Sequence, residues 1–265
     1  MFCCCHFNNS KIENSNLIPS GVGQKENFPS NWMLDRTGDN ISKKNKDFAE
    51  LTFHYWLWKN NLDNLDQNDW IGLCQYRRFW LKKDHEKEVN FKNLFENILT
   101  KIPPEAEKYE SILTSPENIN LKFKSVLKYR KLINNLKNPL PIFIKKNQTI
   151  DVQFEVYTKS GNLIYEVANL MKKEDKYDFL NFISSNNKIN LHNMFIVKKN
   201  TYYHYSKEMF EWLFKCDEYI KKKKKYQNSM PRIQAFLAER FLPFWFRKYT
   251  NFKEWPWVFC DTSKF

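Results

Sequence analysis

The sequence predicts an α/β fold: a Rossmann-like sandwich of helices around a mostly parallel central sheet. Short apolar segments that suit buried strands, such as Phe2–Cys5 and Trp70–Cys74, alternate with longer segments whose apolar residues recur at helical spacing. Aromatic residues form 17% of the 265-residue chain. That share is far above what a disordered chain carries, and a chain of this length can bury a sizeable core.

The N-terminal elements follow from local pattern. Phe2–Cys5 is predicted to be a buried strand ending at His6, the usual opening of an α/β domain. Residues 8–31 are rich in Asn, Ser, Gly and Pro, which predicts a loop with little regular structure. Asp47–Asn60 is predicted to be a helix because its apolar residues recur at steps of three and four.

The later elements are predicted in the same way. Trp70–Cys74 is mostly apolar, as expected for a buried strand. Asn90–Lys101 is expected to be an amphipathic helix that prolines 103 and 104 end. Residues 121–146 are basic and Asn-rich, with a weak periodicity that is compatible with a helix. The remaining predictions are helices at Leu163–Met171, Asp175–Ser184, Thr201–Lys225 and Arg232–Tyr249, the last interrupted at Pro243, and strands at Met194–Val197 and Val258–Cys260.

A net charge of +13 implies an anionic partner. The strongest run is Lys221–Lys225, which is either a solvated helix end or a surface attracted to an anionic membrane. Nucleic acid is not expected as a partner, because charge is its only support and no recognition motif accompanies it. The sequence shows neither a membrane-spanning segment nor a signal peptide, so we expect a cytoplasmic protein.

The six cysteines fit that compartment. Cys3, Cys4 and Cys5 are consecutive, and the other three are scattered without the paired spacing of a metal site. The segment Cys3 to His6 could be interpreted as a metal site. Small buried apolar residues are the better interpretation of the cysteines in a reduced compartment.

Two arginines are the best candidates for binding phosphate. The sequence has no Gly-x-Ser-x-Gly, Walker, Gly-x-Gly-x-x-Gly or His-Glu-x-x-His motif, and only five glycines. Side chains would therefore have to hold a phosphate, which the planar fork of arginine does with two charge-assisted hydrogen bonds. Arg77 and Arg78 follow the strand Trp70–Cys74, and ligands bind at the carboxyl ends of such strands. Surface salt bridges are the alternative for this pair, and Tyr76 could either stack on a base or sugar or simply pack.

Three further positions carry candidate polar groups. Asp39 and Asn40 lie in a glycine-led turn and could either cap the next helix or bind a sugar hydroxyl. His192 and Asn193 precede the predicted strand and are open to the same two interpretations. Glu239 lies in an aromatic helix, where a partly desolvated carboxylate can act as a general base or pair with a neighbouring arginine.

Five blocks, in this order, resemble a known family. The blocks are Gly-Asp-Asn-Ile-Ser at Gly38–Ser42, Glu-Leu-Thr at Glu50–Thr52, Tyr-Trp-x-Trp-Lys-Asn at Tyr55–Asn60, Gln-Tyr-Arg-Arg-Phe within Gly72–Phe79, and His-Asn-Met-Phe-Ile at His192–Ile196. Over nearly its whole length the chain is similar to bacterial capsule and lipopolysaccharide glycosyltransferases that carry the domain of unknown function 4422.

The resemblance implies an A-type glycosyltransferase fold in one domain, residues 1–265. Its nucleotide-sugar half would span about 1–115 and its acceptor half about 116–265. The implied reaction transfers a sugar from a nucleotide donor, expected to be a UDP-hexose such as UDP-galactofuranose. The implied acceptor is a growing capsular or lipopolysaccharide glycan, linked to lipid at the inner membrane, where the protein would be peripheral.

The resemblance also implies roles for the candidate residues. Arg77 and Arg78 would stabilise the departing diphosphate, and Glu239 would deprotonate the acceptor if the reaction inverts, with Glu155 as a substitute. The expected substrate-binding residues are Asp39, Asn40, Gln75, Tyr76, Glu155, His192 and Asn193.

Two departures from the family pattern matter. Gln75 stands where the family has a histidine, which leaves open a catalytically degenerate protein that only binds glycan or anionic lipid. No Asp-x-Asp follows a strand, since Asp63 and Asp66 precede one. We therefore expect no metal-ligating residue and no required cofactor, with Mn²⁺ or Mg²⁺ as the alternative.

Overall fold

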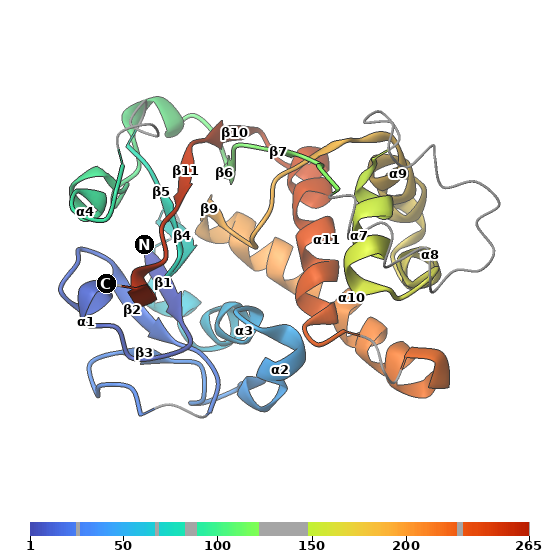
Figure 1. The fold of residues 1–265 in the computed structure, drawn as a ribbon, viewed down its shortest axis with the longest axis horizontal. Helices are drawn as coiled ribbons and strands as arrows, with labels where there is room; N and C mark the ends of the chain where they lie inside the picture. The colour runs from blue at the N-terminus through green and yellow to red at the C-terminus, as the bar shows by residue number, and fades with distance from the viewer. Residues whose placement is uncertain (25–26, 67–68, 83–88, 122–147, 227–229, 265) are drawn as a thin grey trace.

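A nine-stranded sheet forms the centre of the computed structural model, which describes residues 1–24, 27–66, 69–82, 89–121, 148–226 and 230–264 (Figure 1). Its main path runs in the order β10-β6-β9-β4-β1-β2-β3, and β5 joins β4 to β11. The strands are β1 Phe2–Cys5, β2 Ile18–Gly21, β3 Met33–Leu34, β4 Trp70–Gln75, β5 Arg78–Trp80, β6 Ser111–Thr114, β9 Phe195–Lys198, β10 Phe252–Trp255 and β11 Trp257–Phe259. A separate two-stranded ladder pairs β7 (Glu117–Asn118) with β8 (Lys188–Ile189).

The sheet is mixed but mostly parallel, as predicted. Along the main path β10 pairs with β6, and β4, β1, β2 and β3 pair with one another, all in parallel. β9 runs antiparallel to both of its neighbours, β4 and β6. The start of β9 therefore lies beside the carboxyl ends of β4 and β6, which is where α/β sheets bind ligands.

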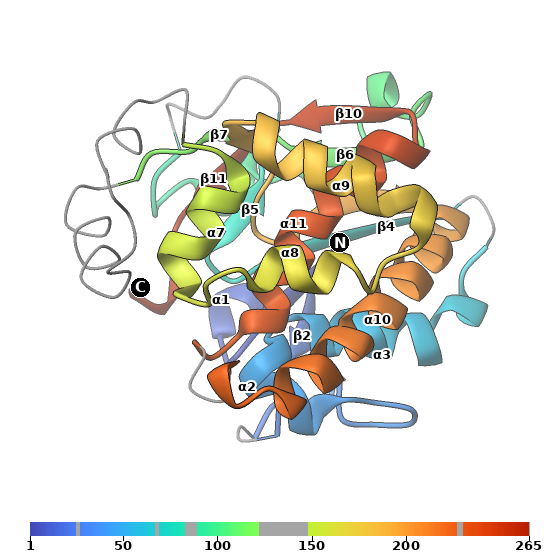
Figure 2. The same ribbon diagram turned by 90° about the vertical axis from the view of Figure 1, so that its right-hand side faces the viewer.

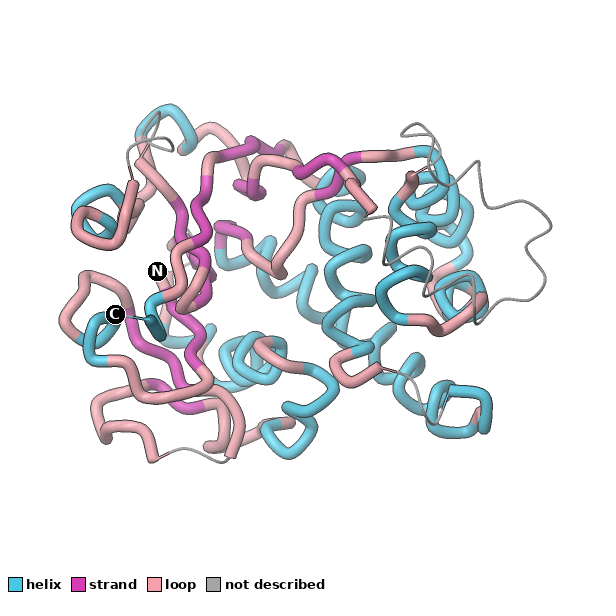
Figure 3. Tube along the Cα trace, viewed as in Figure 1, coloured by secondary structure: helices cyan, strands magenta, loops and turns pink. Residues whose placement is uncertain are grey.

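Helices cover the sheet unequally. They are α1 Ser10–Glu13, α2 Asn45–Phe48, α3 Leu51–Asn60, α4 Leu94–Asn97, α7 Ile150–Thr158, α8 Leu163–Ala168, α9 Lys173–Ser185, α10 Lys199–Lys222 and α11 Ile233–Tyr249. Figures 1 and 2 show the long helices α10 and α11 and the helices α7 to α9 gathered on one side of the sheet. Figure 3 shows the same division, with the strands between this helical side and a side made mostly of loops. None of the described helices combines the length and the apolar character needed to cross a bilayer.

The side chains of β1 show how the sheet separates two cores. Cys4 packs into the larger core beneath the long helices, whereas Cys3 and Cys5 pack into the smaller core on the opposite face. This alternation follows from the two-residue period of a strand. All six cysteines are buried and unbridged, which confirms their interpretation as small apolar residues.

The local predictions for two segments were wrong. Residues 8–31 contain α1, which Asn9 caps by accepting from two backbone amides, and β2, which gains its structure by pairing with β1. Of the helix predicted at 90–101, only the short helix α4 forms. Ile98 instead makes a β-bridge with Leu81, and the Leu99 amide donates to the Trp80 carbonyl. Backbone pairing with a neighbouring segment overrides the helical pattern there.

The last long helix is not interrupted at Pro243. α11 continues from Ile233 to Tyr249 although Pro243 has no amide to donate within it. Its buried aromatic residues, including Phe241 and Phe244, pack into the larger core and hold the helix together across the missing hydrogen bond. The weak helical periodicity noted in the sequence lies at residues 121–146, almost wholly outside the described residues.

Candidate active site

A cavity of about 170 Å³ lies where β4 ends. Its walls come from the turn between β4 and β5, the residue pair before β9, the start of α3 and the first turns of α11, elements that meet in the centre of Figure 1. Five of its nine lining residues were predicted from the sequence. The lining residues are Glu50, Gln75, Arg77, Arg78, His192, Arg232, Ala235, Phe236 and Glu239.

The tight connection between β4 and β5 presents the two predicted arginines. Gln75 and Arg78 pair across this antiparallel hairpin, with Tyr76 and Arg77 at its tip. The Arg77 guanidinium carbon lies 4.8 Å from the centre of the Tyr76 ring, and that of Arg78 lies 5.5 Å from the ring of Phe259. Burial lowers the pKa of Arg78, and the nearby Arg77 charge acts in the same direction. Neither guanidinium forms an ion pair with a carboxylate of the described residues, so two cations lie in the site without direct neutralisation.

Gln75 connects one of these arginines to the opposite wall. Its Nε2 donates to the His192 carbonyl at 2.6 Å, and its Oε1 accepts from Arg78 Nη1 at 3.0 Å. The side chain thus uses a donor and an acceptor at once, as a neutral imidazole also can. The structure assigns Gln75 a positioning contact that does not need an ionisable group.

Two consecutive residues shortly before β9, His192 and Asn193, adopt a left-handed backbone. His192 has φ 81° and Asn193 has φ 51°, a conformation that asparagine tolerates better than most residues. This turn points the His192 amide at Glu239 Oε1, 3.2 Å away, and packs the His192 ring edge-on against Trp257. His192 Nε2 lies 3.3 Å from Glu117 Oε1. His192 therefore joins three separate segments at the cavity wall.

A buried carboxylate with a half-exposed cation forms the next part of the wall. Glu50 Oε1 accepts from Asn193 Nδ2 at 2.9 Å, and its Oε2 lies 3.3 Å from Arg232 Nη2. The side chain of Glu50 is 4% exposed and that of Arg232 is 48% exposed. Burial alone raises the pKa of Glu50, but the Arg232 charge and the Asn193 hydrogen bond outweigh it and hold that pKa below its usual value. Glu50 is therefore a buried anion behind a half-exposed cation.

Glu239 faces the cavity from α11 and has both oxygens engaged. Oε1 accepts from the His192 amide, and Oε2 accepts from Arg240 Nη1 at 3.0 Å. Arg240 is almost wholly buried and also donates to Gln153 Oε1 at 2.9 Å. The direction of the Glu239 carboxylate is thus fixed from two sides, and each oxygen keeps a second lone pair for a ligand.

Comparison with known protein families gives one match over most of the chain. The family model described as "Domain of unknown function (DUF4422)" matches residues 1–251. The chain belongs to this family. Comparison with curated proteins found no match.

Among solved structures, this DUF4422 chain is similar to WbbM, whose title describes a bifunctional glycosyltransferase in its apo form. The TM-score is 0.65 at 19% sequence identity, and the match covers 98% of this chain and 45% of the WbbM chain. The chain therefore spans less than half the length of that protein. At this identity the likeness shows the fold: an α/β architecture shared with a glycosyltransferase.

Five of the predicted site residues lie outside the cavity in this DUF4422 protein. Asp39 accepts from the Tyr55 hydroxyl at 3.1 Å, and Asn40 accepts from the Ser42 amide, so that both stabilise the turn before α2. The others are Tyr76, which supports Arg77; Asn193, which lies behind the wall; and Glu155, which is buried in α7. Their contact with a substrate stays a prediction, as does the division of the domain near residue 115.

The sequence reasoning missed two charged residues of the cavity, Glu50 and Arg232. Glu50 belongs to one of the five family blocks, and that was the available signal. Arg232 has φ 71° and directly precedes α11. It was predicted only as the start of a helix, because a contact with a residue 182 positions away leaves no local pattern.

The described residues do not form a metal site by themselves. No group of three or more His, Cys, Asp or Glu side chains in the described ranges is arranged to hold an ion. The carboxylates of the cavity, Glu50 and Glu239, are each held by an arginine. The fit of this site to Mn²⁺ or Mg²⁺ is therefore poor.

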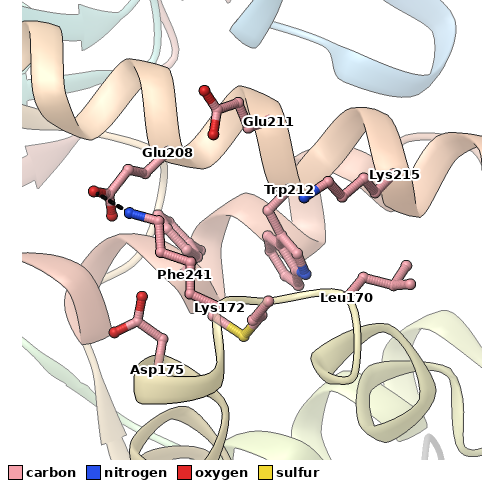
Figure 4. A pocket seen from close by; sticks show the side chains of 9 residues that line it. Leu170, Lys172, Asp175, Glu208, Glu211, Trp212, Lys215 and Phe241 are labelled. Carbon is pink, nitrogen blue, oxygen red and sulfur yellow. Dashed lines mark hydrogen bonds and ion pairs between the residues drawn. The ribbon is translucent and has the colours of Figure 1, made fainter.

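A second hollow, between the segment that leads into α9 and the helices α10 and α11, is too small for a substrate. Figure 4 shows Trp212 and Phe241 at its base and the ion pair between Lys172 and Glu208 at its rim. Its volume of about 30 Å³ is that of one or two water molecules. The cavity at the end of β4 is the candidate active site because Arg77, Arg78 and Glu239 line it.

Proposed function

We propose that this protein is a glycosyltransferase that moves a sugar from a nucleotide-sugar donor, a UDP-hexose such as UDP-galactofuranose, onto a capsular or lipopolysaccharide glycan. The observation that carries the proposal is the convergence of Arg77, Arg78 and Arg232 on one cavity at the carboxyl edge of the sheet. Three guanidinium groups at this place suit a diphosphate. The fold shared with a glycosyltransferase supports the same assignment.

The arginines would act on the departing nucleotide. When the bond between the anomeric carbon and the diphosphate oxygen breaks, its electron pair goes to the diphosphate, and negative charge grows there. Arg77 and Arg78 are already held in place by Tyr76, Gln75 and Phe259, so little reorganisation is needed to stabilise that charge. Such preorganised electrostatic stabilisation is commonly the largest contribution to lowering a barrier.

Glu239 would receive the proton of the acceptor if the reaction inverts the anomeric centre. The acceptor oxygen forms its bond to the anomeric carbon, and the hydroxyl proton passes to a Glu239 oxygen. The His192 amide and Arg240 orient that carboxylate without using all of its lone pairs. Glu155 is the less favourable base, because it is buried in α7 and does not line the cavity.

The size of the cavity limits which part of the donor it holds. Its volume of about 170 Å³ is below the range of roughly 300–1,000 Å³ usual for pockets that enclose a whole small-molecule ligand. We assign to it the diphosphate and the reacting end of the sugar. The nucleoside would extend along the sheet edge, and a lipid-linked glycan acceptor would approach from the Glu239 side.

Calorimetric titration with UDP, GDP and CMP tests the donor site. We expect UDP to bind in the micromolar range and binding to be lost in a variant carrying both Arg77→Gln and Arg78→Gln. A matched control carries Lys92→Gln and Lys101→Gln, two exposed lysines away from the cavity, and should bind normally. Absence of nucleotide binding, or undiminished binding in the arginine variant, would contradict the proposal.

Measuring turnover of the donor distinguishes an enzyme from a protein that binds the donor without reacting with it. Incubation with UDP-hexoses should release UDP slowly by transfer to water, and Glu239→Gln should reduce that release while leaving UDP binding within about twofold. UDP binding without release from any donor, with or without Mn²⁺, would instead favour the degenerate binding protein.

A further inference from the structure

Two lysine-rich segments that are far apart in sequence meet on one surface. Lys44 Nζ and Lys221 Nζ lie 2.7 Å and 2.8 Å from the same oxygen of Asp217. This shared contact joins the turn before α2 to the end of α10, and both segments lie along the lower edge of the molecule in Figures 1 and 2. We call the eight lysines Lys43, Lys44, Lys46 and Lys221–Lys225 the basic surface.

Much of the charge of the basic surface is not neutralised. The described carboxylates among or paired with these lysines are Asp47, Glu166, Asp217 and Glu218. Half of the lysines have no ion pair within the described chain, and all of that half are exposed. They are Lys43, Lys46, Lys223 and Lys224. A free concentration of positive charge therefore faces solvent here.

An exposed apolar side chain follows the last of these lysines by five positions in the sequence. Met230 is 41% exposed, and Pro231 after it is exposed too. Lysines around an exposed apolar side chain are the composition of surfaces that lie on a membrane. The ammonium groups of Lys223 and Lys225 lie over the rings of Tyr219 and Tyr226, 5.3 Å and 4.7 Å from the ring centres, and both lysines stay exposed.

We propose that the basic surface binds the anionic phospholipid face of a membrane. Each lysine near such a surface gains attraction from the negative headgroups, and four unpaired ones are enough for reversible binding. The basic surface also adjoins the candidate active site. α2, which carries Lys46, packs against α11, whose first turns line the cavity. Docking would therefore bring the exposed side of the cavity close to the bilayer.

Nucleic acid fits this surface less well. Binding of single strands combines positive charge with exposed aromatic side chains on which bases stack. In the lysine-rich segments Tyr226 is buried and Tyr219 is half-buried, and the exposed large apolar residue beside them is Met230. Within the described part of these segments no aromatic ring is exposed for stacking, which favours lipid headgroups over nucleic acid.

Vesicle co-sedimentation with the full chain tests the proposal independently of any catalytic activity. We expect binding to vesicles of 70% phosphatidylcholine and 30% phosphatidylglycerol at 0.1 M salt, little binding to pure phosphatidylcholine, and loss of binding at 0.5 M salt. A variant carrying Lys43→Gln, Lys46→Gln, Lys223→Gln and Lys224→Gln should bind at least tenfold more weakly. These four changes leave the ion pairs of the basic surface intact.

The matched control changes four other exposed lysines that have no ion pair with a described residue, Lys92, Lys101, Lys108 and Lys253, each to Gln. They lie around α4 and β10, at the opposite edge of the molecule in Figure 1. The control variant has the same net charge as the test variant and should bind vesicles like the unchanged protein. Three results would each overturn the proposal. They are equal weakening in both variants, equal binding to neutral vesicles, and tighter binding to single-stranded RNA than to the vesicles. The test variant should bind UDP as the unchanged protein does. A loss of vesicle binding then cannot be attributed to damage at the donor site.

Discussion

Gln75 holds Arg78 at the end of β4 through a 3.0 Å hydrogen bond from Arg78 Nη1 to Gln75 Oε1. Because the other end of the amide donates to the His192 carbonyl, the contact ties the arginine to β9. An amide does not titrate, so this link is the same at every pH. The exchange of the family's histidine for glutamine is therefore compatible with a working site.

Gln75→Leu should weaken UDP binding about tenfold, because a hydrogen bond to a charged group is worth about 1.5–3 kcal/mol and Arg78 loses its support. Gln75→His should bind like the unchanged protein at pH 8 and more weakly below pH 6.5, where a protonated ring would repel Arg78. Calorimetry at both pH values measures this. Equal affinity for the leucine variant would remove Gln75 from the positioning of Arg78.

Arg232→Gln should lower the free energy of unfolding at pH 7 by about 1–2 kcal/mol. Breaking a buried ion pair costs about 3–5 kcal/mol, and solvent screening of the half-exposed arginine reduces that figure. The lowered pKa of Glu50 adds stability above the unfolded-state pKa, and this stability is lost as pH falls through the folded-state pKa. The loss caused by Arg232→Gln should therefore shrink at acidic pH in urea unfolding.

The matched variant for this pair is Glu50→Gln combined with Arg232→Gln. It should recover most of the stability, since no buried carboxylate is then left without its cation. Strictly additive losses would show that the two side chains do not interact.

Two buried groups should give stability opposite dependences on pH. Burial raises the pKa of Asp35 to about 6 and lowers the pKa of His54 to about 4. Between pH 4 and 6 the folded state binds the extra proton at Asp35, so stability falls as pH rises. Across the same window the unfolded state binds the extra proton at His54, so stability rises with pH.

A single substitution at either group should remove that group's contribution to the pH dependence of stability. Relative to the unchanged protein, Asp35→Asn should gain stability with rising pH from 4 to 6, and His54→Phe should lose it. Each change approaches about 3 kcal/mol, since one pKa unit corresponds to about 1.4 kcal/mol. Urea unfolding at pH 4.5, 5.5 and 6.5 measures both, and parallel pH curves for the two variants would contradict the assignment.

Gly38→Ala should destabilise the protein more than Gly161→Ala. Both glycines have positive φ, 54° and 63°, so both substitutions incur the backbone cost of about 1–2 kcal/mol. At Gly38 the new Cβ would also lie 2.1 Å from Asn60 Oδ1, whereas nothing lies within 4 Å at Gly161. Thermal unfolding should separate them by at least about 1 kcal/mol. Equal losses would mean that Asn60 moves aside freely.

The parts of the fold that were predicted are those with a strong local pattern. β1 and β4 were predicted with nearly their observed bounds, because burial on both faces makes them continuous apolar runs. β6 and β10 were missed, since Ser111, Lys253 and Glu254 break such a run and the strands exist through pairing. Pairing also gave β2 a strand conformation in a segment whose composition predicts a loop.

The residues of the candidate site also divide into those that a local sequence pattern predicts and those whose place depends on the folded chain. Arg77 and Arg78 were found because their position after a strand is visible in the sequence. His192 was also predicted, but it reaches the cavity because β9 enters the sheet antiparallel, and a composition pattern does not specify strand direction. The pairing of Glu50 with Arg232 joins residues from distant helices, so it emerges only when the chain is folded.

The antiparallel insertion of β9 has a consequence for synthesis of the chain. Gln75 and the His192 carbonyl that it binds are 117 positions apart, so β4 keeps an unpaired apolar edge until the chain beyond residue 198 has been made. Unpaired edges are templates for aggregation, and folds dominated by distant contacts form slowly. The interval between translation of β4 and of β9 is therefore when the open edge of β4 most favours aggregation, and recovery of UDP binding should coincide with the last refolding phase.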